Sequence, residues 1–160
     1  MKRRTFMGLG AATAFLGGAS VYALADSSEG EFEIMKSEEE WRKILTEEQF
    51  AVMRKEATER AFTSPLNDEK REGIFHCAAC DLPLFSSEAK FDSGTGWPSF
   101  WRPIKSSAVG TSRDLKLGYP RTEVHCARCG GHLGHIFNDG PRPTGKRHCI
   151  NGAGMDFKPA

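Results

Sequence analysis

The chain has 160 residues, a length that fits one domain, and its 27% of charged residues excludes both a membrane-embedded protein and a disordered tail. The net charge of +1 argues against a protein that binds a polyanion. Three of the 22 basic residues lie in residues 1–25, so the remaining chain carries 19 basic against 21 acidic side chains, a formal charge of −2 that disfavours nucleic acid further.

Residues 1–25 have the pattern of an export signal. Lys2-Arg3-Arg4 precedes an uncharged, mildly hydrophobic stretch that ends in Ala23-Leu24-Ala25, the small-x-small pattern that signal peptidase cuts. Arg3-Arg4-Thr5-Phe6-Met7 resembles the twin-arginine signature, whose export route carries folded proteins. The alternative is an uncleaved membrane anchor, because the stretch is just long enough to span a bilayer. We expect cleavage, no stable membrane insertion afterwards, and a periplasmic or other extracytoplasmic location.

Two short helices are predicted at the start of the mature chain. Residues 26–36 are polar and acidic and are interpreted as a linker to a domain that covers residues 37–160. Ser37 with Glu40, and Thr46 with Gln49, form two capping boxes. Apolar residues at helical spacing follow each box and predict helices over about 37–45 and 46–57, whose apolar faces serve packing. These residues are Trp41, Ile44, Leu45, Phe50, Val52 and Met53.

From about residue 63 onward, Gly, Pro, Asn and Asp separate short runs rich in strand-forming residues, such as 73–77, 123–126 and 149–151. These are strand and turn signals. We therefore predict a mainly β domain, mostly antiparallel, with a small helical cap at its N-terminus.

Four of the five cysteines form two matched CxxC pairs, Cys77 with Cys80 and Cys126 with Cys129. In a tight turn this spacing directs both sulfurs at one ion about 2.3 Å away, and four thiolates complete a closed tetrahedral shell around Zn²⁺. We expect one structural zinc ion per chain, acquired before export because metal binding and folding are coupled. Gly130 and Gly131 allow the chain to turn away after the second pair.

Three other interpretations of these cysteines exist. Structural disulfides suit an oxidising compartment, but a CxxC disulfide closes too small a loop to stabilise much. A redox CxxC usually opens a helix in an α/β fold, which the surrounding residues do not predict. Iron also binds four thiolates and is less favoured than zinc.

Cys149 is the only cysteine without a CxxC partner, and it is either an inert buried residue or a nucleophile. In the loop 91–101, Trp97 is a candidate wall for an apolar ligand group, whereas Phe91, Phe100 and Trp101 are assigned to packing. For His132 and His135 we favour hydrogen-bonding or proton-transfer roles over metal ligation. His76 and His125 each directly precede the first cysteine of a CxxC pair and are interpreted as structural or exposed.

Five motifs, in order, closely resemble the methionine-R-sulfoxide reductases, the B-type reductase family, over about residues 38–158. They are Gly-Thr-Gly-Trp-Pro-Ser-Phe (94–100), the two CxxC pairs, His-Leu-Gly-His-Ile-Phe (132–137), Asp-Gly-Pro (139–141) and Arg-His-Cys-Ile-Asn (147–151). The resemblance implies repair of oxidised methionine in proteins or peptides. It also implies two antiparallel sheets arranged like a tent, with zinc at the closed end.

The resemblance places the family's nucleophile on Cys149, its oxygen-binding and proton-handling residues on His132, His135 and Asn151, and the aromatic contact of the substrate methyl group on Trp97. The chemistry agrees with these roles. Thiolate attack on a sulfoxide sulfur needs a lowered thiol pKa, which a nearby histidine can provide. The oxygen needs a proton as its bond breaks, and the cysteine becomes a sulfenic acid.

Two departures from the family pattern are visible. Thr95 stands where many members carry a resolving cysteine, so we predict that an external reductant, a thioredoxin-like protein or a small thiol, attacks oxidised Cys149. His148 stands where an aromatic residue is common. The competing functions are a zinc-ribbon binding module and a periplasmic thiol-disulfide oxidoreductase, and zinc content separates the second from the reductase. We expect a monomer.

Overall fold

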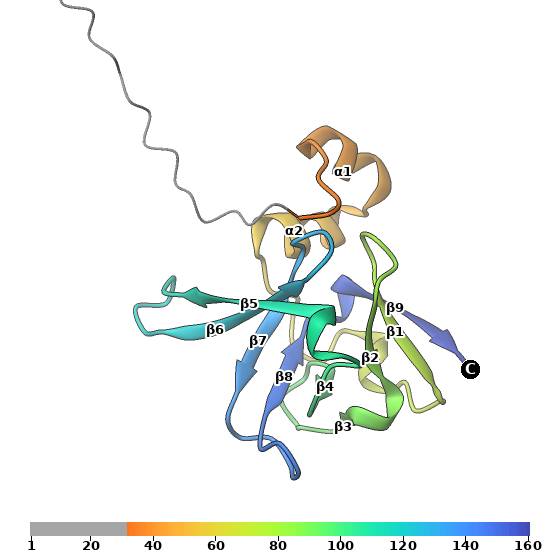
Figure 1. Cartoon of the computed structure of the whole chain (residues 1–160), viewed down its shortest axis with the longest axis vertical. Helices are drawn as coiled ribbons and strands as arrows, with labels where there is room; N and C mark the ends of the chain where they lie inside the picture. The colour runs from red at the N-terminus through yellow and green to blue at the C-terminus, as the bar shows by residue number, and fades with distance from the viewer. Residues whose placement is uncertain (1–31) are drawn as a thin grey trace, which may run out of the picture.

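The computed structural model describes residues 32–160 (Figure 1), so the predicted signal peptide and residues 26–31 of the predicted linker lie outside the described residues. Residues 32–36 have no regular secondary structure, and the Ile34 N–H donates a hydrogen bond to the Arg128 carbonyl oxygen over 3.0 Å. Within residues 32–160, no helix combines the length and the apolar character that a membrane crossing requires.

The two predicted helices are present as α1 (Glu38–Ile44) and α2 (Glu47–Lys55). Both capping boxes are confirmed, with Ser37 and Thr46 as the N-caps. Each helix is shorter than predicted, because the N-cap lies outside the helix and α2 ends at Glu56 in the left-handed conformation (φ 54°).

The packing faces are confirmed for five of the six residues, and the sixth prediction is wrong. Ile44 is 53% exposed, because the short helix α1 contacts the domain through Trp41 and the chain bends at Leu45. The buried residues of this cap are Trp41, Leu45, Phe50, Val52 and Met53.

The described residues form two antiparallel sheets, which confirms the mainly β fold. The smaller sheet has the order β2 (Pro83–Ser86), β1 (Gly73–Cys77) and β9 (Met155–Pro159). The larger sheet has the order β3 (Lys90–Phe91), β4 (Ser99–Phe100), β8 (Arg147–Ile150), β7 (His132–Phe137), β6 (Arg121–Cys126) and β5 (Val109–Asp114). Short 3-10 turns connect them at η1 (Pro65–Asn67), η2 (Ser87–Ala89), η3 (Ser106–Ala108) and η4 (Gly152–Gly154).

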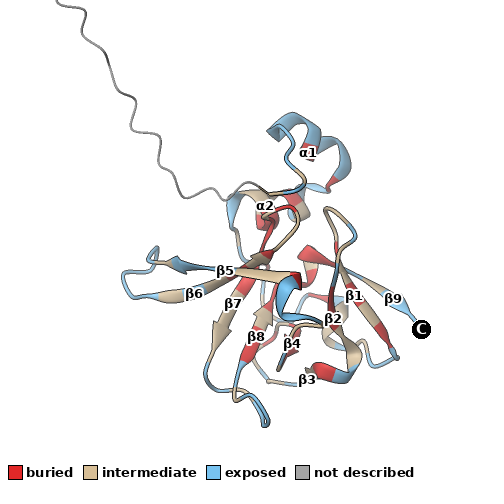
Figure 2. Cartoon of the chain, in the orientation of Figure 1, coloured by how far each residue is buried: buried red, intermediate tan, exposed pale blue. Residues whose placement is uncertain are grey.

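The core lies where the two sheets meet. The Phe100 ring of β4 stacks on Phe85 of β2, with ring centroids 4.4 Å apart, and meets the edge of Phe75 of β1 at 5.0 Å. All three are fully buried, which confirms the packing assignment of Phe100. Figure 2 shows the buried residues gathered on the central strands, whereas the far end of the β5–β6 hairpin is exposed. Strand β8 runs between β4 and β7 and therefore holds Cys149 inside a sheet.

Candidate active site and metal site

The two CxxC pairs occupy equivalent places in the fold. Strand β1 ends at Cys77 and strand β6 ends at Cys126, and each continues into a turn that carries the second cysteine. The residue after each pair has a left-handed backbone, with φ 61° at Asp81 and φ 67° at Gly130, and this conformation turns the chain away. The turn at Gly130 was predicted, whereas the use of an aspartate at the first pair was not.

The four thiols of these pairs converge on one point. Their sulfur atoms all lie within 4.8 Å of one another. Cys77 Sγ lies 3.7 Å from Cys129 Sγ, and Cys80 Sγ lies 3.5 Å from Cys126 Sγ. A tetrahedron with metal–sulfur bonds of about 2.3 Å has edges of about 3.8 Å. A disulfide would need about 2.05 Å, so the arrangement fits a four-thiolate metal site.

The thiols shift one another's pKa values in both directions: hydrogen bonds from Cys126 and the other thiols lower the pKa of Cys129. Hydrogen bonding to Cys126 and the other thiols, together with burial, raises the pKa of Cys77. Three of the four cysteines are buried, and burial disfavours several thiolates in one place unless a cation binds them, which is the donor chemistry of Zn²⁺. No further ligand position is needed in a closed four-sulfur shell, so the metal would serve the structure.

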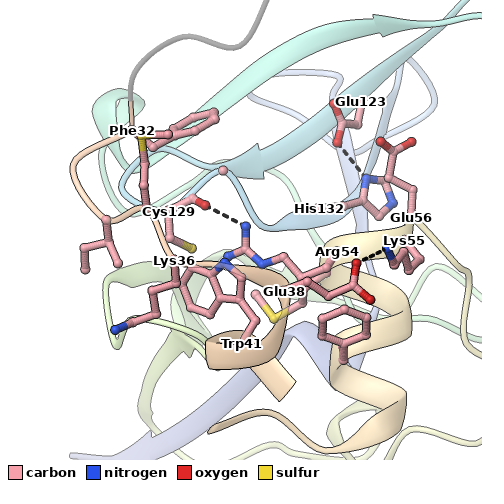
Figure 3. Close-up of a pocket in the computed structure, with 15 residues that line it drawn as sticks. Phe32, Lys36, Glu38, Trp41, Arg54, Lys55, Glu56, Glu123, Cys129 and His132 are labelled. Atoms are coloured by element: carbon pink, nitrogen blue, oxygen red, sulfur yellow. Dashed lines mark hydrogen bonds and ion pairs between the residues drawn. The ribbon is translucent and has the colours of Figure 1, made fainter. Parts of the chain in front are cut away.

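In each CxxC pair, one arginine donates a hydrogen bond to the main-chain carbonyl oxygen of the second cysteine. Arg54 of α2 donates from Nη1 to the Cys129 carbonyl oxygen over 2.9 Å, and Arg128 donates to the Cys80 carbonyl oxygen over 3.4 Å. Figure 3 shows the Arg54 guanidinium between Cys129 and the Trp41 ring, whose centroid lies 3.8 Å from the guanidinium carbon. Its Nε and Nη2 atoms are buried without a hydrogen-bond partner. These contacts place positive charge beside the metal site.

A pocket of about 450 Å³ lies beside this region, and both Cys129 and the predicted catalytic residue His132 line it. Phe32, residues 34–36 and the two helices line it, and Figure 3 shows His132 and Glu123 at its far wall. His132 reaches this pocket and is not among the residues that line the cleft around Cys149.

The cleft around Cys149 is smaller, about 130 Å³. Pockets that enclose a drug-sized ligand are usually about 300–1,000 Å³, so this cleft suits a single side chain presented from outside. Four of the five predicted site residues meet here, namely Cys149, His135, Asn151 and Trp97. The remaining lining residues are Thr58, Arg121, Gly134 and Phe137.

The register of the larger sheet places Cys149 between two polar neighbours. Its position is opposite His135 on β7 and opposite Ser99 on β4. Directly opposite residues of antiparallel strands share a face, with Cβ atoms about 4.5–5.5 Å apart. His135 and Cys149 therefore share a face of the sheet, and both line the cleft.

The Cys149 thiol has an environment that the sequence did not predict. Burial raises its pKa, and the charge of Arg147 and hydrogen bonds from Thr95 and Arg147 oppose that effect only in part. We expected a histidine to lower this pKa, but the groups that lower it are an arginine and a threonine. Arg147 is itself held by two hydrogen bonds of 2.9 Å to the Asp139 carboxylate, so its charge has a fixed position.

The two predicted catalytic histidines lie side by side because of an irregularity in β7. Residues three apart on a regular strand point to opposite faces. The β6–β7 register skips Leu133, since His125 pairs with His132 while Val124 pairs with Gly134. This bulge turns both rings to one side, with centroids 5.4 Å apart.

Each of these histidines is bound to a carboxylate from the β5–β6 hairpin. His132 Nδ1 lies 2.7 Å from a Glu123 carboxylate oxygen, and His135 Nε2 lies 2.7 Å from an Asp114 carboxylate oxygen. A carboxylate on one ring nitrogen orients the imidazole and stabilises its protonated form. Neither carboxylate was predicted, because the sequence alone does not reveal which strand lies beside β7.

The charges of these pairs follow from their surroundings. A backbone hydrogen bond from Lys116 and hydrogen bonds from His135 and Arg121 lower the pKa of Asp114 to about 2. Burial lowers the pKa of His135, although the Asp114 hydrogen bond opposes this. Burial also opposes ionisation of Glu123, but hydrogen bonds from His125, His132 and Ser112 hold its pKa below the ordinary value.

Asn151 and Trp97 are both anchored to the main chain. The Asn151 side chain accepts from the Glu59 N–H over 3.1 Å and donates to the Leu133 carbonyl oxygen over 2.9 Å. The Trp97 indole N–H donates to the Glu59 carbonyl oxygen over 3.1 Å. Their catalytic and binding roles stay predictions, while their positions on the cleft are observed.

His148 faces away from the Cys149 thiol. It is 6% exposed, its Nδ1 donates to the Phe100 carbonyl oxygen over 3.1 Å, and its ring packs against Phe85 in the core. Successive residues of a strand point to opposite faces. The adjacent ring therefore belongs to the core, and it is not among the groups that shift the pKa of Cys149.

Comparison with known proteins decides the family. Residues 45–159 match the family model described as the SelR domain. The chain belongs to the SelR family. The match covers α2 and both sheets, and so contains the cysteine cluster and the cleft.

Curated SelR-family relatives align over nearly their whole lengths. A protein from Pseudomonas putida (strain W619), named peptide methionine sulfoxide reductase MsrB, is 58% identical over 126 residues, which are 79% of this chain and 95% of the relative. Proteins with the same name from Leptospira interrogans and Methanosarcina barkeri are 51% and 54% identical, over 79% and 78% of this chain and 97% and 88% of theirs.

Proposed function

We propose that this SelR-family protein reduces methionine-R-sulfoxide in oxidised peptides and proteins to methionine. The observation that carries the proposal is the cleft. Cys149 lies there apart from the four metal-site cysteines, with His135 opposite it and the Trp97 indole beside it. The names of the relatives support the same activity.

The proposed first step is attack of the Cys149 thiolate on the sulfoxide sulfur. The substrate oxygen takes up protons and passes to the cysteine sulfur, so one thiol and one sulfoxide give one sulfenic acid and one thioether. The methionine sulfur gains two electrons, and Cys149 is oxidised to the sulfenic acid level. Arg147 supports the reacting thiolate, because its positive charge favours the ionised form of Cys149.

We assign the proton delivery to His135 more readily than to His132. His135 lines the cleft and is paired with Asp114, which stabilises the imidazolium between proton transfers. His132 lies behind it with Glu123, and we assign it the orientation of His135 through the contact between their rings. The Asn151 amide is assigned to the sulfoxide oxygen or an ordered water.

The preference for the R epimer is assigned to the shape of the cleft. A sulfoxide sulfur carries a methyl group, an oxygen and a methylene chain, and the two epimers exchange the places of methyl and oxygen. Trp97 offers an apolar surface, whereas His135 offers a polar one. Only one epimer can place its methyl group on the indole and its oxygen near the imidazole at once.

Regeneration is proposed to use an external thiol. Within the described residues, the other four cysteines form the metal site, and Thr95 occupies the position beside Cys149. A first thiol attacks the sulfenic sulfur, releases water and forms a mixed disulfide with Cys149. A second thiol then frees Cys149, and the two reductant sulfurs leave as a disulfide.

Location is proposed from the first 25 residues, which the structure does not describe. Arg3 and Arg4 begin a twin-arginine pattern, and the metal site is consistent with export after folding. Changing Arg3 and Arg4 together to lysine should retain the protein in the cytoplasm, as fractionation would show. Export of that double variant at the wild-type level would rule the route out.

An epimer-resolved assay tests the activity. Peptides carrying methionine-R-sulfoxide or methionine-S-sulfoxide are incubated with the protein and dithiothreitol, with Cys149→Ser as the control. We expect turnover of the R epimer alone and none by the variant. Turnover confined to the S epimer, or unaffected by Cys149→Ser, would refute the assignment. A metal-binding module with no enzymatic activity would turn over neither epimer.

A further inference from the structure

Glu59 is a buried carboxylate to which the proposed chemistry assigns no role. It is 7% exposed and lies in the segment between α2 and β1, which has no regular secondary structure at this point. Its two carboxylate oxygens accept hydrogen bonds from the Gly152 N–H over 2.5 Å and from the Ala153 N–H over 2.9 Å. Glu59 therefore binds the start of η4, directly after Asn151 on the chain.

The main chain of Glu59 contacts two walls of the cleft. Its N–H donates to the Asn151 side-chain oxygen, and its carbonyl oxygen accepts from the Trp97 indole N–H, each over 3.1 Å. The side chain of Glu59 thus fixes a piece of main chain that in turn holds both residues. Trp97 and Asn151 come from segments far apart in sequence, and Glu59 joins them.

The close approach of these segments depends on Gly152. A Cβ atom at this position would lie 1.8 Å from Ser64 Oγ and 3.4 Å from a Glu59 carboxylate oxygen. Ser64 is also buried, at 8% exposure, so there is no open space into which the neighbours could move. The glycine allows the 59–64 segment to pack on the end of the nucleophile strand.

We propose that Glu59 is a positioning residue, which sets the places of the Trp97 indole and the Asn151 amide relative to Cys149. This inference rests on the proposed function and deepens it. Glu59 is not among the residues that line the cleft, so it acts through Trp97 and Asn151 and does not touch the reacting atoms.

Glu59→Gln is the informative variant, because it keeps the size of the side chain and changes its hydrogen bonding. A glutamine offers one oxygen and one NH2 group, so one of the two backbone N–H groups would face a donor and lose its bond. Glu59→Asp, which keeps both acceptor oxygens on a shorter side chain, serves the same test if the glutamine variant does not fold. Glu72→Gln, an exposed glutamate, is the matched control.

Two measurements on folded protein decide the proposal. The first is kcat and KM, separately, for an R-sulfoxide peptide. The second is the NMR resonance of the Trp97 indole N–H, assigned with Trp97→Phe. We expect Glu59→Gln to raise KM about tenfold, the size of effect that loss of one charged hydrogen bond produces, and to shift the indole resonance. Glu72→Gln should leave both unchanged.

A merely structural role gives a different result. It would lower the thermal midpoint of Glu59→Gln but leave KM and the indole resonance of the folded molecules as in the wild type, and this outcome would overturn the proposal. If the wild-type protein reduces neither epimer, the proposed function fails, and the indole resonance alone still decides whether Glu59 positions Trp97.

Discussion

The Thr95 side chain lowers the pKa of the Cys149 thiol, against the larger raising effect of burial, and it stands at the end of a row of hydroxyl groups. Thr95 Oγ1 is 2.8 Å from Ser93 Oγ, which is 2.8 Å from Ser99 Oγ, and Ser99 is opposite Cys149 in the sheet. The residue in the place of a resolving cysteine thus interacts with the Cys149 thiol but carries no thiol of its own.

Thr95→Cys should convert the protein to internal resolution. A thiol at this position would attack the sulfenic sulfur of Cys149 and form a disulfide without an external partner. After reaction with sulfoxide in the absence of reductant, intact mass should fall by about 2 units in the variant and rise by about 16 units in the wild type. A stable oxygen adduct on the variant would show that the two sulfurs cannot meet. Loss of about 2 units from the wild type would refute external regeneration.

Arg147→Gln should make Cys149 a weaker nucleophile at neutral pH. Burial already raises the pKa of Cys149, and the Arg147 charge is the main effect in the other direction. Its loss raises the pKa further, so the thiolate fraction falls and alkylation by iodoacetamide at about pH 8 should slow several-fold. Rates measured across pH should converge where both thiols are ionised. Arg113→Gln, on an exposed part of β5, is the control, and equal slowing in that variant would contradict the local effect.

The reactive and metal-binding residues of the site were more predictable from the sequence than the residues that hold them in place. The cysteine cluster, Cys149 and Trp97 were found because each belongs to a short motif whose spacing carries its own meaning. Asp114 and Glu123 were missed, because their pairing with the histidines depends on which strands are neighbours in the sheet. Local sequence periodicity does not reveal which strands pair or in which register.

One unpredicted feature and one wrong prediction have the same origin. The bulge at Leu133 gives the histidines a common face, although their spacing on a regular strand predicts opposite faces. Ile44 was assigned to a packing face because its spacing is helical, but the domain meets only one side of a two-turn helix. In both cases the packing of one element on another decided the outcome, and helix or strand period alone did not.

Removal of the metal should unfold the protein. A structural zinc ion contributes about 10–16 kcal/mol of apparent binding free energy in small zinc domains, and a whole domain is usually stable by only about 5–15 kcal/mol. The site joins the ends of β1 and β6, which belong to different sheets. A strong chelator should therefore abolish the near-ultraviolet circular dichroism signal. An unchanged spectrum after complete metal loss would show that the core is stable alone.

Arg54→Gln should release the metal faster without changing its ligands. Arg54 donates to the Cys129 carbonyl oxygen and places a positive charge beside a shell that carries excess negative charge once filled. Loss of a group that supports metal ligands usually costs about 10–100-fold in affinity. Release into a chelating dye should accelerate by at least about tenfold, with Arg113→Gln as the control for the loss of one arginine charge. Equal release rates would assign Arg54 to helix packing alone.

His148→Phe should make the protein more resistant to mild acid. Burial lowers the pKa of His148 in the folded state, so the unfolded chain binds its proton more readily. The stability contributed by neutral His148 is present above the unfolded pKa of about 6.5 and is lost as the pH falls below it. A phenylalanine cannot take up a proton, and that part of the pH dependence disappears.

Thermal midpoints at about pH 7.5 and about pH 5.5 test this, since the unfolded-state pKa of about 6.5 lies between these two values. Acidification should lower the midpoint of His148→Phe by at least about 2 °C less than it lowers the wild type. The variant also loses the hydrogen bond to the Phe100 carbonyl oxygen, but that cost is the same at both pH values and cancels in the comparison. His135, whose pKa burial also lowers, is present in both proteins and maintains the remaining acid sensitivity. Identical losses in the two proteins would show that the pKa of His148 is the same in the folded and the unfolded chain, and would contradict the effect of burial.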